Sequence, residues 1–182
     1  MTARRSRAKE KLRLRRGTLD DIDLLVDHRV AMFREMGGRS RAALASHGPN
    51  YLAWLVPRLV SAELVAFIAE DSTGVPLGSG AVWFQPSHPR PGSPAQRAPY
   101  IFSMYTDPAA RGRGVATVIV NEAAGLSRRL GYGRVSLHAS AMGRPVYDRM
   151  GFLTTTEMQL PLNATERRRM LRGRAPAKAA RR

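Results

Sequence analysis

The chain has 182 residues, which is enough for one domain with a sizeable core and too few for two. Its 43% hydrophobic content is typical of a globular protein, and no segment approaches the roughly 18 consecutive apolar residues of a membrane-spanning helix. The absence of cysteine excludes disulfides, thiolate metal sites and a cysteine nucleophile. Since the basic N-terminus also lacks the apolar stretch of a signal peptide, we expect a cytoplasmic protein that contacts no membrane.

The formal net charge of +16 is concentrated at the two ends. Residues 1–16 and 163–182 each hold eight Lys or Arg against one Glu, which leaves only +2 for residues 17–162. Such charge-rich, weakly apolar segments usually stay solvated, because they cannot bury enough surface to offset the entropy of ordering. We therefore expect disordered basic segments at 1–11 and 163–182 around one domain at 12–162. Contact of these segments with nucleic acid is the alternative, although no aromatic side chains interleave with the basic ones.

The first third of the chain combines one strand with helices. Residues 12–16 alternate in the manner of a strand, and Thr18 with Asp21 resembles a capping box at the start of a helix. Apolar residues then recur at helical spacing until Gly37. A second helical region follows, which we expect to break near Gly48-Pro49 and to resume through residues 51–59.

The rest of the chain predicts five strands and two helices. Strands at 64–70 and 77–84 form an antiparallel pair, and five prolines mark 86–99 as a loop. The further predicted elements, in chain order, are a strand at 100–106, a helix at 113–130, a strand at 135–138, a helix at 145–150 and a strand at 152–160. The order β-α-α-β-β-β-α-β-α-β predicts a mixed α/β fold class.

The most informative segment is the turn between the strand at 100–106 and the helix at 113–130. Residues 111–116 read Arg-Gly-Arg-Gly-Val-Ala, and the small residues let a ligand approach the backbone closely. The first amides of a helix have no partner within it, and the helix dipole favours an anion there, as in a pyrophosphate cradle. The turn lacks the Gly-Lys-Ser/Thr ending of a nucleoside-triphosphate P-loop and the third-glycine spacing of a dinucleotide fold. A turn that needs glycine but binds no ligand is the alternative.

Two motifs carry a resemblance to a known family. Arg111-Gly112-Arg113-Gly114-Val115-Ala116 resembles the acetyl-CoA signature Arg/Gln-x-x-Gly-x-Gly/Ala of the GNAT superfamily of N-acetyltransferases. About thirty residues on, Val146-Tyr147-Asp148-Arg149-Met150-Gly151-Phe152 is similar to that family's tyrosine-x-x-x-glycine-phenylalanine segment. The element order also resembles that of the family, over about residues 12–160. The resemblance implies a mostly antiparallel central sheet with flanking helices, acetyl-CoA as acyl donor, an amine acceptor and no metal.

The resemblance also implies roles for individual residues. Tyr147 would protonate the departing thiolate, and an amide of Met104 or Tyr105 would stabilise the oxyanion. Ser140 stands where the family often has an asparagine that bonds the pantetheine arm. The implied cofactor-binding residues are Met104, Tyr105, Thr106, Arg111, Gly112, Arg113, Gly114, Val115, Ala116 and Ser140. A core-facing aromatic on a short helix is the alternative interpretation of Tyr147.

The motifs do not identify the general base. A typical primary amine is protonated at pH 7, so direct attack needs a base or a water chain that leads to one. Some family members carry a glutamate on the fourth strand, but residues 100–106 contain no acid. Glu35, Glu70 and His138 are candidates, although solvated surface glutamates and a satisfied strand-end histidine are the simpler interpretations.

The sequence leaves the acceptor, the acyl-chain length and the oligomeric state (monomer or homodimer) open. The first two helices and the loop at 86–99 would line the acceptor side. Large and basic side chains in these regions and nearby are Phe33, Met36, Tyr51, Trp54, Trp83, Arg34, Arg39 and Arg41. If some of them face the cleft, an aromatic or anionic small amine suits them better than a polycation. Two other functions stay possible: a non-catalytic acyl-CoA sensor, and an RNA- or ribosome-associated factor that acts through its basic ends.

Overall fold

The computed structural model describes residues 12–37, 39–89 and 96–173, and the chain divides into two compact units between His138 and Ala139. The expected basic segment at 1–11 lies outside the described residues. In the described part of the chain, no helix has the length and apolar character to cross a membrane.

The first unit is built on a five-stranded sheet with the spatial order β1-β2-β3-β4-β5. The strands are β1 (Arg13–Arg16), β2 (Leu64–Glu70), β3 (Pro76–Pro86), β4 (Arg97–Thr106) and β5 (Ser136–Leu137). Neighbouring strands are antiparallel, except that β5 runs parallel to β4. The predicted mixed α/β fold with a mostly antiparallel sheet is thereby confirmed. β4 begins earlier than predicted because it accommodates Pro99 opposite Phe84, which shortens the proline-rich loop.

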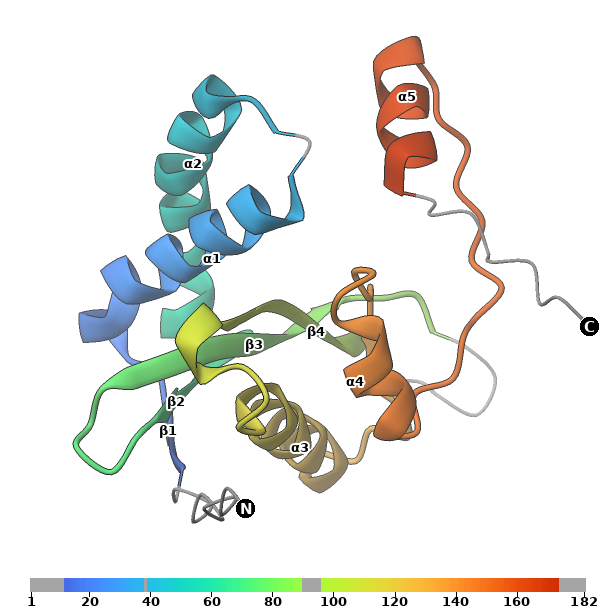
Figure 1. Ribbon diagram of the computed structural model, residues 1–182. Coiled ribbons are helices and arrows are strands. Elements are labelled where there is room, and N and C mark those ends of the chain that lie inside the picture. The colour runs from blue at the N-terminus through green and yellow to red at the C-terminus, as the bar shows by residue number, and fades with distance from the viewer. Residues whose placement is uncertain (1–11, 38, 90–95, 174–182) are drawn as a thin grey trace, which may run out of the picture. The chain divides into compact units, whose positions relative to one another are not determined.

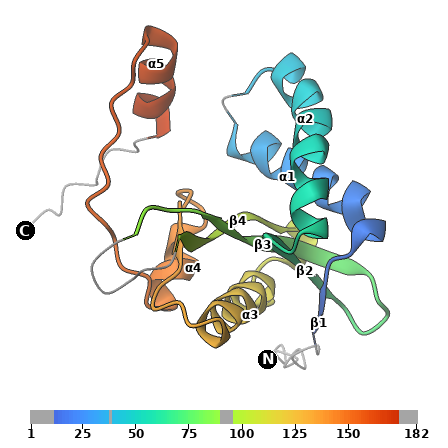
Figure 2. The ribbon, with the colours of Figure 1, turned by 180° about the vertical axis from the view of Figure 1, so that it is seen from behind.

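Helices cover both faces of this sheet, as Figures 1 and 2 show from opposite sides. A 3-10 turn, η1 (Leu19–Asp21), carries the predicted capping box and leads into α1 (Ile22–Met36). α1 and α2 (Arg41–Val60) lie on one face, and α3 (Val115–Arg129) lies on the other. Alternation along β2 serves both layers: Ala66 and Ile68 join the core under α1 and α2, while the buried Phe67 points to the opposite face.

α2 is one continuous helix, so the predicted break near Gly48-Pro49 is wrong. A proline inside a helix leaves the carbonyl of the fourth preceding residue without a donor, which usually breaks or kinks the helix. Here Pro49 and Ala45, whose carbonyl the proline leaves without a donor, are both exposed, so water can satisfy the freed carbonyl. The helix is held on both sides of the proline, because Ser40 Oγ accepts a hydrogen bond from Ala43 N at 3.1 Å and Leu55 is fully buried.

β3 and α3 approach each other closely because β3 carries Gly78 and Gly80. A Cβ atom at Gly80 would lie 2.9 Å from Ile119 Cγ2, and one at Gly78 would lie 2.7 Å from Val115 Cγ1. A Cβ atom at these positions would also collide with β4, at Tyr105 O and Met104 Sδ, so neighbours on both β4 and α3 would have to shift. The two glycines therefore fix where the first turn of α3 lies against the sheet.

The second unit contains α4 (Arg144–Arg149) and α5 (Ala164–Gly173) joined by irregular chain. The predicted strand at 152–160 is wrong: these residues form neither helix nor strand, and Leu153, Met158 and Leu160 are at least 81% exposed. A strand needs a neighbouring backbone to pair with, and the described residues of this unit offer no strand. The helix α5 occupies part of the basic segment at 163–182, whose expected disorder stays a prediction, as does the division of the chain at 12–162.

Candidate active site

β4 has an open edge along its second half. β5 pairs with β4 only at Tyr100 and Ile101, so residues 102–106 have β3 on one side and, among the described residues, no strand on the other. Backbone N–H and C=O groups along such an edge can pair with an added extended chain that carries amides. Met104, Tyr105 and Thr106, for which the family resemblance implies cofactor binding, lie on this edge.

A β-bulge interrupts the pairing of β4 with β3 at the same place. Ser79 faces Tyr105 and Ala81 faces Phe102, so Ser103 and Met104 lie together opposite Gly80. Ser103 has a φ of 53°, which is unusual for a residue other than glycine, and a bulge of this kind releases backbone groups from the ladder. The bulge therefore places unpaired backbone polar groups in the middle of the open edge.

The turn after β4 presents a row of backbone N–H groups. Gly112 and Gly114 have φ values of 77° and 87°, and a Cβ atom at either would meet no atom within 4 Å. Among the described residues, the N–H groups of Gly112 and of residues 114–117 have no hydrogen-bond acceptor, whereas those of Arg111 and Arg113 form 3.4 Å bonds within the turn. α3 starts here, so its dipole adds positive potential to the same row. The turn has the chemistry of an anion cradle.

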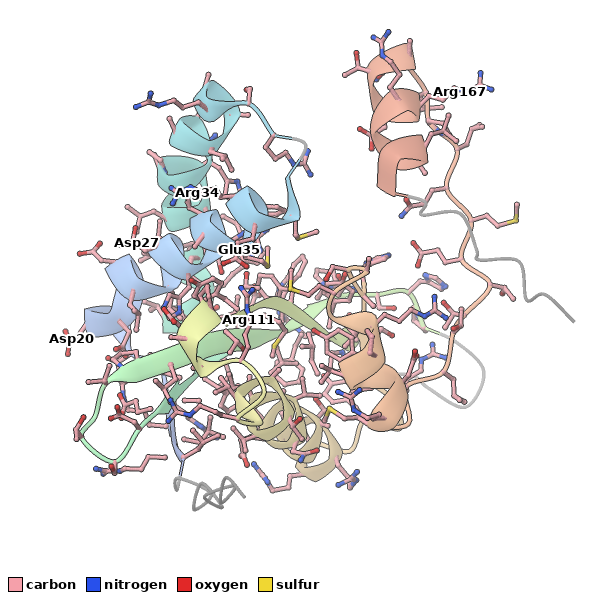
Figure 3. All side chains as sticks on the ribbon, in the orientation of Figure 1. Asp20, Asp27, Arg34, Glu35, Arg111 and Arg167 are labelled. Carbon is pink, nitrogen blue, oxygen red and sulfur yellow. The ribbon has the colours of Figure 1, made fainter. Side chains whose placement is uncertain are left out.

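Arg111 and Glu35 form an ion pair that links this turn to the end of α1 (Figure 3). The Arg111 guanidinium also reaches the carbonyl of Thr106 at 3.4 Å. Glu35 thus holds the side chain of Arg111 beside the cradle, and an anion bound there would compete with Glu35 for the guanidinium. Glu35, one of the predicted bases, is occupied by this arginine.

The other two predicted bases have partners too. Glu70 is buried and accepts a 2.6 Å hydrogen bond from Arg15, which also binds Asp21, so Glu70 holds β1 to β2. It lies on β2, which β3 separates from β4. His138, just after β5, contacts the hydroxyl of Tyr100 through Nδ1.

His28 is a functional candidate that the sequence reasoning missed. Its Nδ1 lies 2.9 Å from Ser79 Oγ, and its ring centroid lies 4.7 Å from that of Tyr105, beside the bulge. Burial lowers the pKa of His28, against the charges of Asp27 and Asp107, which raise it. The imidazole therefore stays neutral at neutral pH. A polar residue three positions after the buried Leu25, on the face that packs on the sheet, was the available signal.

Aromatic residues of the predicted acceptor side gather over the same stretch of β4. Trp54 packs edge-on against both Trp83 and Phe102, with ring centroids 5.1 and 5.7 Å apart, and stacks on Tyr51 at 5.9 Å. Arg29 of α1 lies among these rings and donates a 2.5 Å hydrogen bond to Ser103 Oγ. Met36, by contrast, is 52% exposed at the end of α1. The structure thus brings together most of the predicted aromatic residues.

The second unit holds the other two predicted site residues. Tyr147 of α4 is 8% exposed, packs against Phe152 at 5.7 Å, and has no hydrogen-bond partner for its hydroxyl among the described residues. Burial raises the pKa of Tyr147 above its usual value, so the hydroxyl keeps its proton at neutral pH. The Ser140 hydroxyl accepts a 3.1 Å bond from Gly143 N and so helps to shape the start of α4. No group of three or more potential metal-binding side chains occurs in the described part of the chain.

Known acetyltransferases are similar to this chain in sequence and in fold. The model of the acetyltransferase (GNAT) family matches residues 25–152. A GCN5-related N-acetyltransferase from Ralstonia eutropha is 35% identical, with a TM-score of 0.76 over 84% of this chain and 99% of that one. A predicted acetyltransferase from Clostridium acetobutylicum, solved with acetyl-CoA, is 29% identical, with a TM-score of 0.75 over 86% and 98%.

More distant structures share the fold alone. The aminoglycoside N-acetyltransferase AAC(6')-Iy, solved with CoA, is 17% identical, with a TM-score of 0.63 over 87% of this chain and 98% of that one. Among curated protein sequences, none matches the chain.

Proposed function

Because the chain belongs to the acetyltransferase (GNAT) family, we propose that it transfers an acetyl group from acetyl-CoA to an amine of a small molecule or peptide. The observation that carries this proposal is the row of open N–H groups at Gly112 and residues 114–117, directly after the open edge of β4. A pyrophosphate needs several converging donors and a close approach to the backbone, and this turn supplies both.

The proposed donor fits along three features of this chain. The pyrophosphate lies on the amides of the turn, where no Cβ atom blocks it. The pantetheine arm, which contains two amide groups, pairs with the free backbone groups of Met104 to Thr106. The thioester then lies at the bulge, where an amide of Met104 or Tyr105 donates to the carbonyl oxygen as it becomes an oxyanion.

The chemistry is a direct attack in a ternary complex. The neutral amine attacks the thioester carbon, a C–N bond forms, the C–S bond breaks, and the thiolate leaves with a proton from an acid. Tyr147 is the proposed acid because burial keeps its hydroxyl protonated. His28 is the proposed base: with Nδ1–H donated to Ser79 Oγ, the lone pair of Nε2 can accept a proton from the amine.

The proposal is tested by thiol release from acetyl-CoA over a panel of amines, with the variant Tyr147→Phe. We expect Tyr147→Phe to lower kcat by about 10²–10⁴-fold and to leave the affinity for CoA within about twofold, since it removes only a proton donor. Asp148→Asn is the matched control on the same helix, because it removes only an exposed ion pair with Arg144, and it should leave kcat near the native value. An acyl-CoA sensor without catalysis is the outcome if CoA binds but no amine releases thiol.

A further inference from the structure

Arg29 has an environment that differs from that of an ordinary surface arginine. Its Cζ lies 4.4 Å from the ring centroid of Tyr51, 5.0 Å from that of Phe33 and 5.4 Å from that of Phe102. These three rings come from α2, α1 and β4, so the guanidinium is half-buried between the two helices and the sheet. A cation in such a place normally has a carboxylate partner, because removing a charge from water is costly.

Among the described residues, the hydrogen-bond acceptors of the Arg29 side chain are neutral groups. Its Nε donates to His47 Nε2 at 3.1 Å and its Nη1 donates to Ser103 Oγ at 2.5 Å. Both acceptors are neutral: burial and the charges of Arg29 and Arg39 lower the pKa of His47, so His47 stays uncharged at neutral pH. In residues 12–37, 39–89 and 96–173, no Asp or Glu forms an ion pair with Arg29.

The donors of Arg29 are only partly used. A guanidinium carries five N–H groups, of which the two bonds above use one on Nε and one on Nη1. Three N–H groups on the two terminal nitrogens therefore have no acceptor among the described residues. Donors on neighbouring nitrogens of a planar guanidinium match the two oxygens of a carboxylate.

The position of these donors relates them to the reaction. Ser103, which orients Nη1, is the bulged residue next to Met104, and the preceding residue of α1, His28, contacts Ser79 and Tyr105 on the other side of the bulge. An anion bound by Arg29 therefore lies over the same stretch of β4 as His28, the proposed base.

We propose that Arg29 binds a carboxylate carried by the acceptor, so that the acceptor is a small amino acid-like amine. This inference rests on the proposed function and names its substrate class. The planar guanidinium of Arg29, with aromatic rings against it, matches a planar carboxylate through two parallel N–H···O bonds, and its one positive charge balances a monoanion rather than a phosphate dianion. The carboxylate accepts two of the three open N–H groups of Arg29, and the amine of the same acceptor then extends toward His28 and the thioester.

The test compares each substrate with the counterpart in which a neutral carboxamide replaces the carboxylate. L-Amino acids of different side chains are assayed against their α-carboxamides for kcat/KM in thiol release from acetyl-CoA. We expect a preference for the carboxylate of about 10- to 100-fold in the native protein. In Arg29→Met the preference falls to about one, and in Arg29→Lys, which keeps the charge but loses the planar fork, it falls to an intermediate value. Because each ratio is taken within one variant, a general loss of folded protein cancels.

Arg58→Lys is the matched control. Arg58 stacks on Trp54 at 4.3 Å in the same aromatic group, but its Nη1 donates to the Trp54 carbonyl at 2.8 Å. We expect this change to lower the melting temperature and to leave the carboxylate preference unchanged. An unchanged preference in Arg29→Met, or equal kcat/KM values for carboxylates and carboxamides in the native protein, overturns the inference.

A binding measurement separates this inference from the proposed function. Calorimetry of the CoA-saturated native protein with the same pairs reads the carboxylate preference without turnover. If CoA binds and no amine is acetylated, the proposed function fails, and a carboxylate that binds more tightly than its carboxamide still supports the anion site. A stronger preference for O-phosphoethanolamine over ethanolamine than for β-alanine over its amide shows a phosphate site and contradicts the proposal.

Discussion

The backbone conformation of Ser103 in the bulge can be tested by comparing the stabilities of two variants, Ser103→Ala and Ser103→Gly. Ser103→Ala removes the hydroxyl that accepts from Arg29, and losing a hydrogen bond to a charged group costs roughly 1.5–3 kcal/mol. Alanine must still adopt the φ of 53°, which costs an L-residue roughly 1–2 kcal/mol. Ser103→Gly loses the same hydrogen bond but relieves this strain. The greater freedom of glycine in the unfolded chain offsets about 0.5–1 kcal/mol of that gain. We therefore expect Ser103→Gly to be more stable than Ser103→Ala by roughly 0.5–1 kcal/mol.

Urea unfolding of the two variants measures this difference. Ala81→Gly, on the neighbouring strand, is the control, because Ala81 is buried and its φ is not positive. There glycine should destabilise by about 0.5–1 kcal/mol, the usual direction within a strand. If Ser103→Gly is instead less stable than Ser103→Ala, Ser103 does not hold a left-handed conformation and the bulge that exposes the backbone of β4 is absent.

Four further predictions test the site and its support. Gly114→Ala should weaken CoA binding at least about tenfold in calorimetry, because a methyl group enters the cradle at a φ of 87°. The control Gly131→Ala, with a φ of 84° at the other end of α3, should lower the stability of the protein and leave CoA binding unchanged. Glu35→Gln should tighten CoA binding about two- to fivefold, since it frees the arginine beside the cradle; a collapse of kcat would instead make Glu35 the base. A hydrogen bond from Arg15 lowers the pKa of Asp21 to about 2, so the stability that Asp21 contributes is present above about pH 4 and is lost as the pH falls through about 2. Asp21→Asn should remove this part of the acid sensitivity, which amounts to at most about 2 kcal/mol in the free energy of unfolding. Because burial lowers the pKa of His28, the acidic limb of kcat/KM should inflect below pH 6.5 and should vanish in His28→Gln; an unchanged limb assigns the base elsewhere.

Much of the fold was predictable because local signals and burial agree. Strand β2 and helix α3 have the expected periodicity. The glycines Gly37 and Gly131 predicted the ends of α1 and α3, and the two helices end just before them in the structure. The turn at 111–116 was predictable from local sequence too, because two glycines between a strand and a helix indicate a turn with positive φ angles. The strand at 152–160 was not, because a strand depends on a partner that no local pattern reveals.

The acceptor side shows where sequence reasoning stops. Arg29 sits at an apolar position of the α1 pattern, and its partners His47 and Ser103 come from α2 and β4. Side chains this distant in sequence meet only through the packing of two helices on the sheet. His28 escaped attention for the same reason, as Ser79 lies 51 residues away in the chain.

The central claim is that the backbone amides at the start of α3 bind the phosphates of CoA. Two-dimensional ¹H–¹⁵N NMR of the protein titrated with CoA tests it most directly. We predict that the amide resonances of Gly112 and residues 114–117 move strongly with CoA, and that those of Gly131 do not. Pantetheine, which lacks the pyrophosphate, should leave these resonances in place. CoA binding that shifts other amides and leaves these five unmoved would contradict the account.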